Sequence, residues 1–124
     1  TVHPRTKKMM NDFGLRELNF LNIRFIEPQG YVDNLSYLFH SDGLITDSGG
    51  MQKEAYWLKK KCVTIRTETE WTETLKNGWN TLLFEDLSSL GKVLASVNKK
   101  YISLYGDSDA AEKITSIILK KITN

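Results

Sequence analysis

The sequence predicts an α/β domain in which a parallel, doubly wound sheet is flanked by helices. Two observations lead to this prediction. Short apolar runs alternate along the chain with stretches in which apolar residues recur at helical spacing. Strands separated by helices pair in parallel, because each crossover returns the chain to the same edge of the sheet. With 124 residues, the chain is long enough for one such domain and too short for two.

The expected elements follow in order from local signals. A first helix at residues 4–12 has Pro4 in its first turn and Gly14 after its end, positions that suit these residues. The apolar runs predict four strands, at residues 23–26, 43–46, 62–65 and 81–84. Helical spacing predicts helices at residues 32–39, 51–58, 87–101 and 109–122, and a brief helix closed by Gly78 is expected at residues 72–77. The helix from Met51 is expected to bury Met51, Ala55 and Leu58.

The charge balance narrows the function classes. Hydrophobic residues make up 40% of the chain and charged residues 26%, and 17 basic against 15 acidic residues give a net charge of +2. This near-balance argues against binding to nucleic acid or to a membrane surface. Lysines cluster near expected helix ends, where positive charge suits the helix dipole, and we interpret them as solvated. These clusters are Lys59–Lys61, Lys99–Lys100 and Lys120–Lys121.

The single cysteine, Cys62, excludes an internal disulfide framework. It lies in an expected strand, so we interpret it as a packed core thiol. No apolar run is long enough to span a bilayer, and no secretory signal is visible. A reducing, cytoplasmic location is therefore expected.

The segment with the clearest chemistry is the turn that follows the expected strand at residues 43–46. Ser48, Gly49 and Gly50 open the next helix, where free backbone N–H groups and the helix dipole favour an anion such as phosphate. The alternative is an ordinary strand-to-helix turn with Ser48 as a helix cap. Glu54 follows about one turn later on the same side, where its carboxylate suits ribose hydroxyls or simply faces solvent.

Four polar side chains follow successive expected strands: His3, Gln29, Ser48 and Arg66. The carboxyl ends of parallel strands share one edge of the sheet, which is where ligands bind in open α/β folds. Arg66 in this position suits a diphosphate oxygen. The alternatives are that Arg66 pairs with a nearby glutamate, Glu68 or Glu70, and that His3 is a capped surface residue.

A metal site is not expected. One cysteine and two histidines, His3 and His40, do not supply the ligands of a zinc site. The carboxylates of residues 66–73 suggest either glycoside hydrolysis or an exposed, hydrogen-bonded loop.

Several motifs together resemble the UDP-N-acetylglucosamine 2-epimerase family, and the resemblance covers essentially the whole chain. The most specific block has the form Thr-Asp-Ser-Gly-Gly-x-Gln-x-Glu-Ala, at residues 46–55. The other matching segments are His3-Pro4, Pro28-Gln29-Gly30-Tyr31, Arg66-Thr67-Glu68-Thr69-Glu70-Trp71-Thr72-Glu73 and Tyr105-Gly106-Asp107.

The resemblance implies a partial Rossmann-like domain from an enzyme of the GT-B type, in which two such domains face a cleft. Residues 1–124 would form most of the carboxyl-terminal, nucleotide-binding domain, incomplete at its start and without the amino-terminal domain. The start at Thr1-Val2, which reads as the end of a strand, fits this expectation. The full-length enzyme is then expected to be a homodimer.

The resemblance also implies roles for matching residues. Ser48, Gly49 and Gly50 would hold the diphosphate of a UDP-sugar, and Glu54 would bind the ribose. Arg66 and Gln29 would contact the nucleotide, and His3 would reach the diphosphate or the sugar as a tentative catalytic residue. The implied reaction inverts the carbon that bears the acetamido group by elimination and re-addition of UDP, without a metal or another cofactor.

Two positions depart from the usual family pattern. Asn34 replaces an aromatic residue near the uracil, and Trp71 and Thr72 interrupt a stretch that usually reads Thr-Glu-Arg-Pro-Glu. The form with tryptophan is closer to the subgroup that acts on diacetamido uronic acids. A hydrolysing 2-epimerase, a fragment of a GT-B glycosyltransferase and a non-catalytic nucleotide-sugar sensor are the alternative functions. The fragment alone is expected to bind UDP without turnover.

Overall fold

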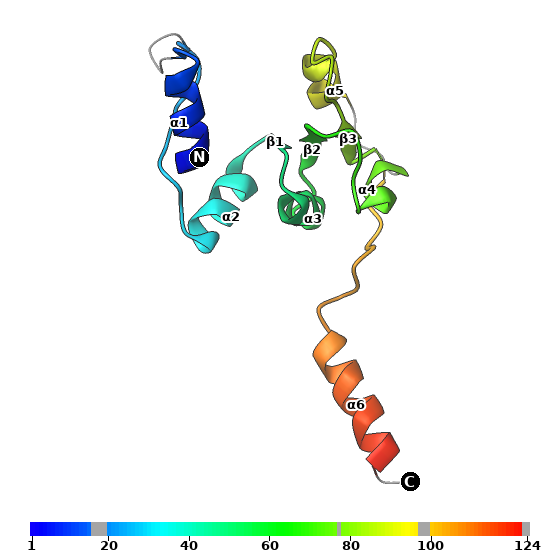
Figure 1. The fold of residues 1–124 in the computed structure, drawn as a ribbon. Coiled ribbons are helices and arrows are strands. Elements are labelled where there is room, and N and C mark those ends of the chain that lie inside the picture. The colour runs from blue at the N-terminus through cyan, green and yellow to red at the C-terminus, as the bar shows by residue number, and fades with distance from the viewer. Residues whose placement is uncertain (16–19, 77, 97–99, 123–124) are drawn as a thin grey trace. The chain divides into compact units, whose positions relative to one another are not determined.

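The computed structural model describes residues 1–15, 20–76, 78–96 and 100–122. The chain forms two compact units, residues 1–37 and 38–124, and each is described by itself. Figure 1 colours the first unit blue to cyan and the second cyan to red. The predicted positions Asn77, Val97 and Lys99 lie outside the described residues.

The first unit contains helix α1, Pro4–Asp12, at the predicted residues. Gly14 follows it with a φ of 68°, a backbone conformation that glycine adopts readily. The strand predicted at residues 23–26 is wrong, because the structure has no strand there. The N–H of Val2 donates to the carbonyl of Ile26 at 2.8 Å, but a strand requires a ladder of successive bonds to a neighbour.

Helix α2, Tyr31–His40, crosses the boundary between the two units and ends in the second. Its residue Leu38 is almost fully buried, and it joins Ala55 and Cys62 in the core of the second unit. The predicted helical spacing at residues 32–39 is confirmed by this element.

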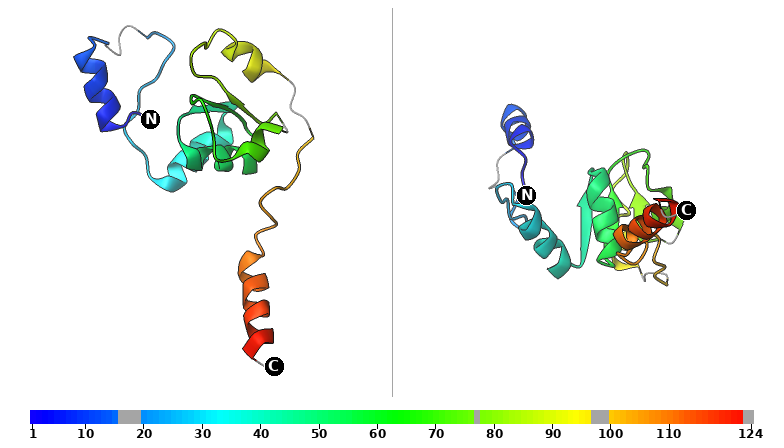
Figure 2. Two further views of the ribbon diagram at one scale, coloured as in Figure 1. Left: turned by 45° about the vertical axis from the view of Figure 1, so that its right-hand side comes forward. Right: turned by 90° about the horizontal axis from the view of Figure 1, so that it is seen from below.

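The second unit is built on a parallel sheet of three strands in the order β1-β2-β3. The strands are β1, Gly43–Thr46, β2, Lys61–Thr64, and β3, Asn80–Leu82. Helix α3, Gly49–Trp57, connects β1 to β2, and helix α4, Thr72–Lys76, connects β2 to β3. The teal and green part of the ribbon in Figure 2 shows these strands with their connecting helices. The predicted parallel sheet flanked by helices is therefore confirmed.

The core surrounds β2, in which all four residues are buried. Cys62 is 1% exposed, in agreement with the packed thiol expected from the sequence. Helix α3 begins two residues before the predicted Met51 and buries Gln52, Ala55 and Tyr56. Of the three residues expected to be buried, Ala55 is fully buried, whereas Met51 and Leu58 are only partly buried, and Leu58 packs against the core.

Lys61 also differs from its interpretation as a solvated charge. It is the first residue of β2 and is only 4% exposed. Its ammonium group donates hydrogen bonds to the carbonyl oxygen of Ser96, at 2.6 Å, and to the Ser96 hydroxyl. Burial lowers the pKa of Lys61 from its ordinary value.

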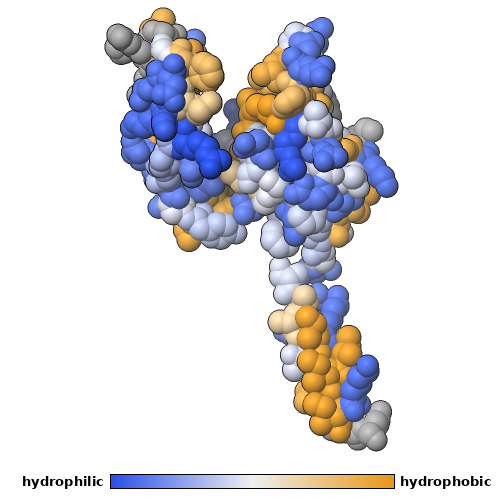
Figure 3. Space-filling view, viewed as in Figure 1, coloured by the Kyte–Doolittle hydropathy of each residue, from blue (hydrophilic) through white to orange (hydrophobic). Residues whose placement is uncertain are grey.

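The last two helices are α5, Leu90–Ala95, and α6, Ala110–Ile122. The apolar stripe predicted on α6 is present but is not packed, since Ile117 is 58% exposed and Ile122 is 74% exposed. Figure 3 shows this stripe as an apolar band along the helix. Among the described residues, no helix combines the length and the apolar character needed to cross a membrane.

Candidate functional site

The site centres on the turn between β1 and α3. Ser48 has an extended backbone, with φ −78° and ψ 125°, and α3 begins at Gly49. The hydroxyl of Ser48 makes no capping hydrogen bond to the helix. The backbone N–H of Ser48 donates to Thr46 Oγ1 at 3.0 Å. The first N–H groups of a helix have no partner within the helix and form its positive end. This turn therefore presents backbone donors that Ser48 does not occupy.

The two glycines of the turn differ in their surroundings. A Cβ at Gly49 would overlap Oε1 of Glu70 and would lie 3.8 Å from Nε1 of Trp71, whereas a Cβ at Gly50 meets open space. Neither glycine has a positive φ. Glycine at position 49 leaves room beside its backbone for the flexible end of the Glu70 side chain, and no unusual backbone conformation is involved.

Arg66 lies beside the same turn through Glu70. Its Nη1 pairs with Oε2 of Glu70 at 3.1 Å, while the other carboxylate oxygen, Oε1, lies against Gly49. One carboxylate therefore joins the guanidinium to the start of α3. The structure thus brings Arg66 and Gly49 to the same carboxylate. It also confirms the alternative prediction that Arg66 pairs with a nearby glutamate.

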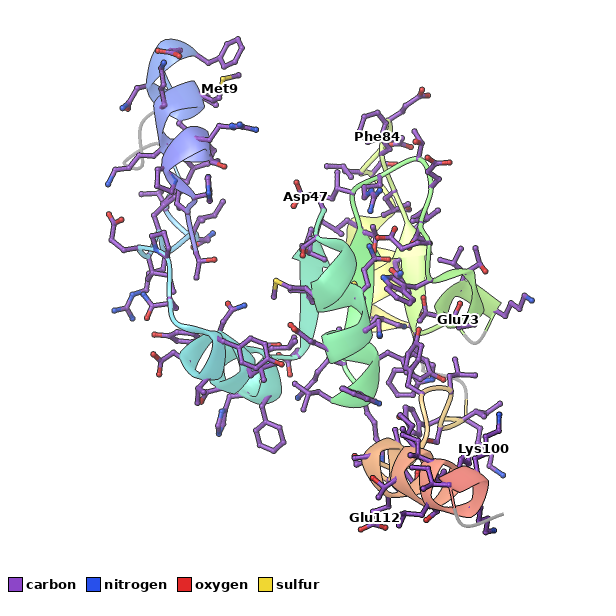
Figure 4. All side chains as sticks on the ribbon, turned by 60° about the horizontal axis from the view of Figure 1, so that its bottom comes forward. Met9, Asp47, Glu73, Phe84, Lys100 and Glu112 are labelled. Atoms are coloured by element: carbon purple, nitrogen blue, oxygen red, sulfur yellow. The ribbon has the colours of Figure 1, made fainter. Side chains whose placement is uncertain are left out.

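Glu54 lies four residues after Gly50 on α3, so the two share one face of the helix. Its side chain is half-buried. Figure 4 labels Asp47 at the turn and Phe84 just after β3, at the end of the sheet where the parallel strands finish. Ser48 follows the end of β1 and Arg66 follows the end of β2, so these two of the four residues predicted for this edge lie after neighbouring parallel strands.

A buried polar network, which sequence reasoning missed, holds the turn to the following loop. Gln52 is fully buried, and its Nε2 donates to the carbonyl oxygen of Ser48 at 3.3 Å. Its Oε1 accepts from Thr69 Oγ1 at 2.5 Å and from Asn80 Nδ2 at 3.0 Å. This one amide connects the first turn of α3, the loop that carries Arg66, and β3.

The network continues on the far side of Asn80. Thr64 Oγ1 donates to Asn80 Oδ1 at 2.8 Å, and Asn80 Nδ2 also donates to Thr74 Oγ1 at 3.3 Å. The hydroxyl of Thr69 accepts from the backbone N–H of Trp71 at 3.1 Å. These bonds hold the backbone at residues 69 and 71 and therefore fix the backbone position of Glu70 between them.

An aromatic cluster lies next to this loop. Lys53 Nζ is 4.3 Å from the ring centroid of Trp71, and Trp71 meets Tyr105 edge to face with centroids 6.2 Å apart. Tyr105 donates its hydroxyl to Glu73 Oε1 at 2.8 Å. Burial is the main cause that raises the pKa of Tyr105, and the hydrogen bond to Glu73 adds to it. The pKa of Glu73 is lowered, mainly because its carboxylate accepts a hydrogen bond from the backbone N–H of Glu73 and secondly because it accepts one from Tyr105.

Trp71 also carries an unmatched donor. Its Nε1 has almost no contact with solvent and finds no hydrogen-bond acceptor within the part of the chain that the structure describes. The same atom is 3.8 Å from the position that a Gly49 Cβ would take. A buried donor without an acceptor is costly, so this N–H favours an acceptor next to the turn.

The remaining predicted site residues, His3 and Gln29, lie in the first unit. His3 is the N-cap of α1, and its Nδ1 accepts from the N–H of Arg5 at 3.2 Å, as in the surface-cap alternative. Gln29 Nε2 donates to the carbonyl oxygen of Glu27 at 2.7 Å. Their convergence with Ser48 and Arg66 stays a prediction.

The structure also contains a cavity outside the site. A cavity of about 330 Å³ is lined by Asp42, Gly43, Ile45 and Leu94, and it contains none of the predicted site residues. Within the described ranges, no group of three or more His, Cys, Asp or Glu side chains is arranged to hold a metal ion.

Comparisons with known proteins match this fold and these motifs. A family model described as UDP-N-acetylglucosamine 2-epimerase matches residues 1–119. A UDP-N-acetylglucosamine 2-epimerase homolog of Methanococcus maripaludis is 38% identical, over 94% of this chain and 34% of its own. A UDP-2,3-diacetamido-2,3-dideoxy-D-glucuronate 2-epimerase of Pseudomonas aeruginosa is 35% identical, over 96% of this chain and 34% of its own.

Solved structures match as well. The UDP-GlcNAc 2-epimerase of Methanocaldococcus jannaschii is 34% identical with a TM-score of 0.86, over 97% of this chain and 35% of its own. The same enzyme in complex with UDP-GlcNAc and UDP gives a TM-score of 0.82 at 34% identity, over 97% of this chain and 34% of its own. The chain spans about a third of the length of these relatives. The sequence motifs, the parallel sheet and the family match agree, and the chain belongs to the UDP-N-acetylglucosamine 2-epimerase family.

Proposed function

We propose that this chain is the UDP-binding part of a UDP-N-acetylhexosamine 2-epimerase, within the carboxyl-terminal domain of a two-domain enzyme. One observation supports the proposal above all: the Glu70 carboxylate lies between Arg66 and Gly49. A group of one negative charge already fits between the guanidinium and the start of α3. A diphosphate offers more charge and more acceptor oxygens to the same donors.

Each predicted residue then has a role. The N–H groups at Gly49 and Gly50, with the Ser48 hydroxyl, hold the diphosphate, and Arg66 binds one of its oxygens. Glu54, one turn along the same face of α3, accepts hydrogen bonds from the ribose. Gln29 contacts the nucleotide and His3 reaches the diphosphate or the sugar.

The proposed reaction inverts the carbon that bears the acetamido group. A base removes the proton from this carbon while UDP leaves, and UDP re-adds after protonation on the other face. Negative charge develops on the diphosphate as the bond to the sugar breaks. Preorganised amides and a guanidinium stabilise that charge without reorganisation, so the site contributes to the chemical step as well as to binding. We assign no general base to this chain.

The whole protein is proposed to bind a UDP-sugar and to act as a cytoplasmic homodimer. Because relatives are about three times as long, we expect this chain alone to bind UDP without catalysing the reaction. The first test is therefore binding, measured by calorimetry with UDP as the ligand and uridine as a probe that lacks phosphate.

The Arg66→Ala substitution is expected to weaken UDP binding by about tenfold or more, since hydrogen bonds to charged groups contribute roughly 1.5–3 kcal/mol. Glu54→Ala is expected to weaken UDP and uridine alike, because it removes a ribose contact. Lys92→Ala, an exposed lysine on α5, removes one positive charge away from the turn and serves as the matched control. Equal affinities for Arg66→Ala and Lys92→Ala would argue against the proposal.

The sugar preference can be narrowed further. The diacetamido-uronate 2-epimerase that is 35% identical to this chain supports that substrate class beside UDP-N-acetylglucosamine, as does the stretch around Trp71. Supplying the full-length enzyme with each UDP-sugar in deuterated water distinguishes them. Deuterium at the epimerised carbon identifies the substrate, whereas acceptor-dependent release of UDP without deuterium would indicate a glycosyltransferase.

A further inference from the structure

The position of Glu70 is unusual for an ordinary surface glutamate. Its Oε2 pairs with Arg66 at 3.1 Å, and its Oε1 occupies the position that a Cβ on Gly49 would take. These are the two groups that the proposed function assigns to the diphosphate. A diphosphate bound beside Arg66 and Gly49 would compete with the Glu70 carboxylate for this space, since both carry negative charge and both would lie next to the same guanidinium.

The contacts of Glu70 are suited to exchange. Its side chain is 49% exposed and that of Arg66 is 36% exposed, so water reaches both groups. Ion pairs with this exposure are weak, and a more highly charged ligand displaces them readily. The backbone on either side of Glu70 is anchored, because Thr69 is bonded to Gln52 and the Trp71 N–H to Thr69. The carboxylate can therefore leave while the loop stays in place.

Trp71 provides an independent observation at the same point. Its indole N–H is buried and lacks an acceptor among the described residues. It lies near the Gly49 position that Oε1 of Glu70 covers. A ligand anion that replaces the carboxylate would bring additional oxygens to this point, and one of them would satisfy the indole donor.

We propose that Glu70 is a built-in competitor for the diphosphate, which occupies the anion position of the empty site and leaves when UDP binds. The inference rests on the proposed UDP-binding function and adds a residue that sets its affinity and its preference for highly charged ligands. Departure of Glu70 frees Arg66 and uncovers the Trp71 indole N–H. Weakly charged anions do not compensate for the lost ion pair, whereas a diphosphate does.

The test is calorimetric titration of the 124-residue chain with UDP and with uridine. Glu70→Gln keeps the size of the side chain and removes its charge, and it is expected to bind UDP about threefold to tenfold more tightly than the wild-type chain. Its affinity for uridine should stay the same. Glu68→Gln removes the same charge from an exposed residue two positions earlier and controls for net charge, with an expected change below about twofold.

A second readout follows the empty site directly. The indole N–H resonance of Trp71, assigned through its loss in Trp71→Phe, is expected to shift in Glu70→Gln without ligand and again on addition of UDP. If Glu70→Gln does not fold, Glu70→Ala tests the same expectation.

Three outcomes separate the two proposals. Equal or weaker UDP binding by Glu70→Gln and Glu70→Ala, with Arg66→Ala still impaired, overturns the competitor role and leaves the UDP site standing. Tighter binding by Glu68→Gln to the same degree also overturns it, because the effect would then be general charge. Absence of UDP binding in the wild-type chain and in both Glu70 variants refutes the proposed function as well.

Discussion

Replacing Gln52 with leucine tests whether the buried polar network holds the site together. Gln52→Leu removes three hydrogen bonds, from Gln52 to Ser48 and from Thr69 and Asn80 to Gln52. The Ser48 carbonyl is at an exposed residue and can bond to water instead. The Thr69 hydroxyl loses its acceptor, and Asn80 Nδ2 keeps only Thr74, at 3.3 Å. The damage is therefore concentrated in two buried donors.

The expected loss of stability follows from these two donors. Leaving a buried polar group unsatisfied costs about 1–3 kcal/mol, so two such groups should lower the free energy of unfolding of Gln52→Leu by about 2–6 kcal/mol. Urea denaturation followed by tryptophan fluorescence measures this change. Thr115→Val, which removes an exposed hydroxyl bonded to the Ala111 carbonyl, is the matched control and should change stability by less than about 0.5 kcal/mol.

A double-mutant cycle separates the network from general packing. Thr69→Val removes the donor that Gln52→Leu leaves orphaned, so the double variant should be more stable than the sum of the single losses by about 1 kcal/mol. Losses below about 0.5 kcal/mol for Gln52→Leu, or strict additivity in the cycle, would show that the network does not hold the turn to the loop.

Three further predictions concern the core and the turn. Burial raises the pKa of the Cys62 thiol from 9.0 to about 11, so the folded state binds more protons than the unfolded state between these pH values. Its contribution to stability should therefore fall as pH rises through this range, and Cys62→Val should make the alkaline loss of stability less steep in urea titrations at several pH values. Burial lowers the pKa of Lys61 below 10.5, so the contribution of Lys61 to stability has the opposite sign and increases as pH rises up to 10.5. Lys61→Met should therefore make the alkaline loss of stability steeper, and an unchanged slope would contradict this. Gly49→Ala places a methyl group against the flexible end of Glu70, so stability should change by less than about 1 kcal/mol while calorimetry shows UDP binding at least about tenfold weaker; unaltered UDP affinity would mean that no phosphate approaches Gly49.

The parts of the fold that the sequence predicts are those encoded by neighbouring residues. The strands at β1 and β2 are short apolar runs, and the Gly49-Gly50 turn follows directly from the end of β1. Pro4 and Gly14 likewise mark the ends of α1. In each case the physical cause lies within a few residues along the chain, so a local pattern is sufficient.

The errors and omissions arise where the cause is distant in sequence. Gln52 and Thr69 are 17 residues apart and Gln52 and Asn80 are 28 apart, so no local pattern indicates that these polar residues bury one another. Lys61 is buried because Ser96, 35 residues away, accepts its hydrogen bonds. The run at residues 23–26 has strand character, but strand formation depends on a neighbour that the run itself does not specify.

Two adjacent positions in the loop that carries Arg66 should differ in how well they accept substitution. Thr69 is 9% exposed and anchored, while Glu70 projects from that anchor with half of its side chain in water. Libraries aimed at new nucleotide preferences should therefore randomise position 70 freely and leave 69 untouched. In such a screen, folded and soluble clones should be common among variants at position 70 and rare among variants at position 69.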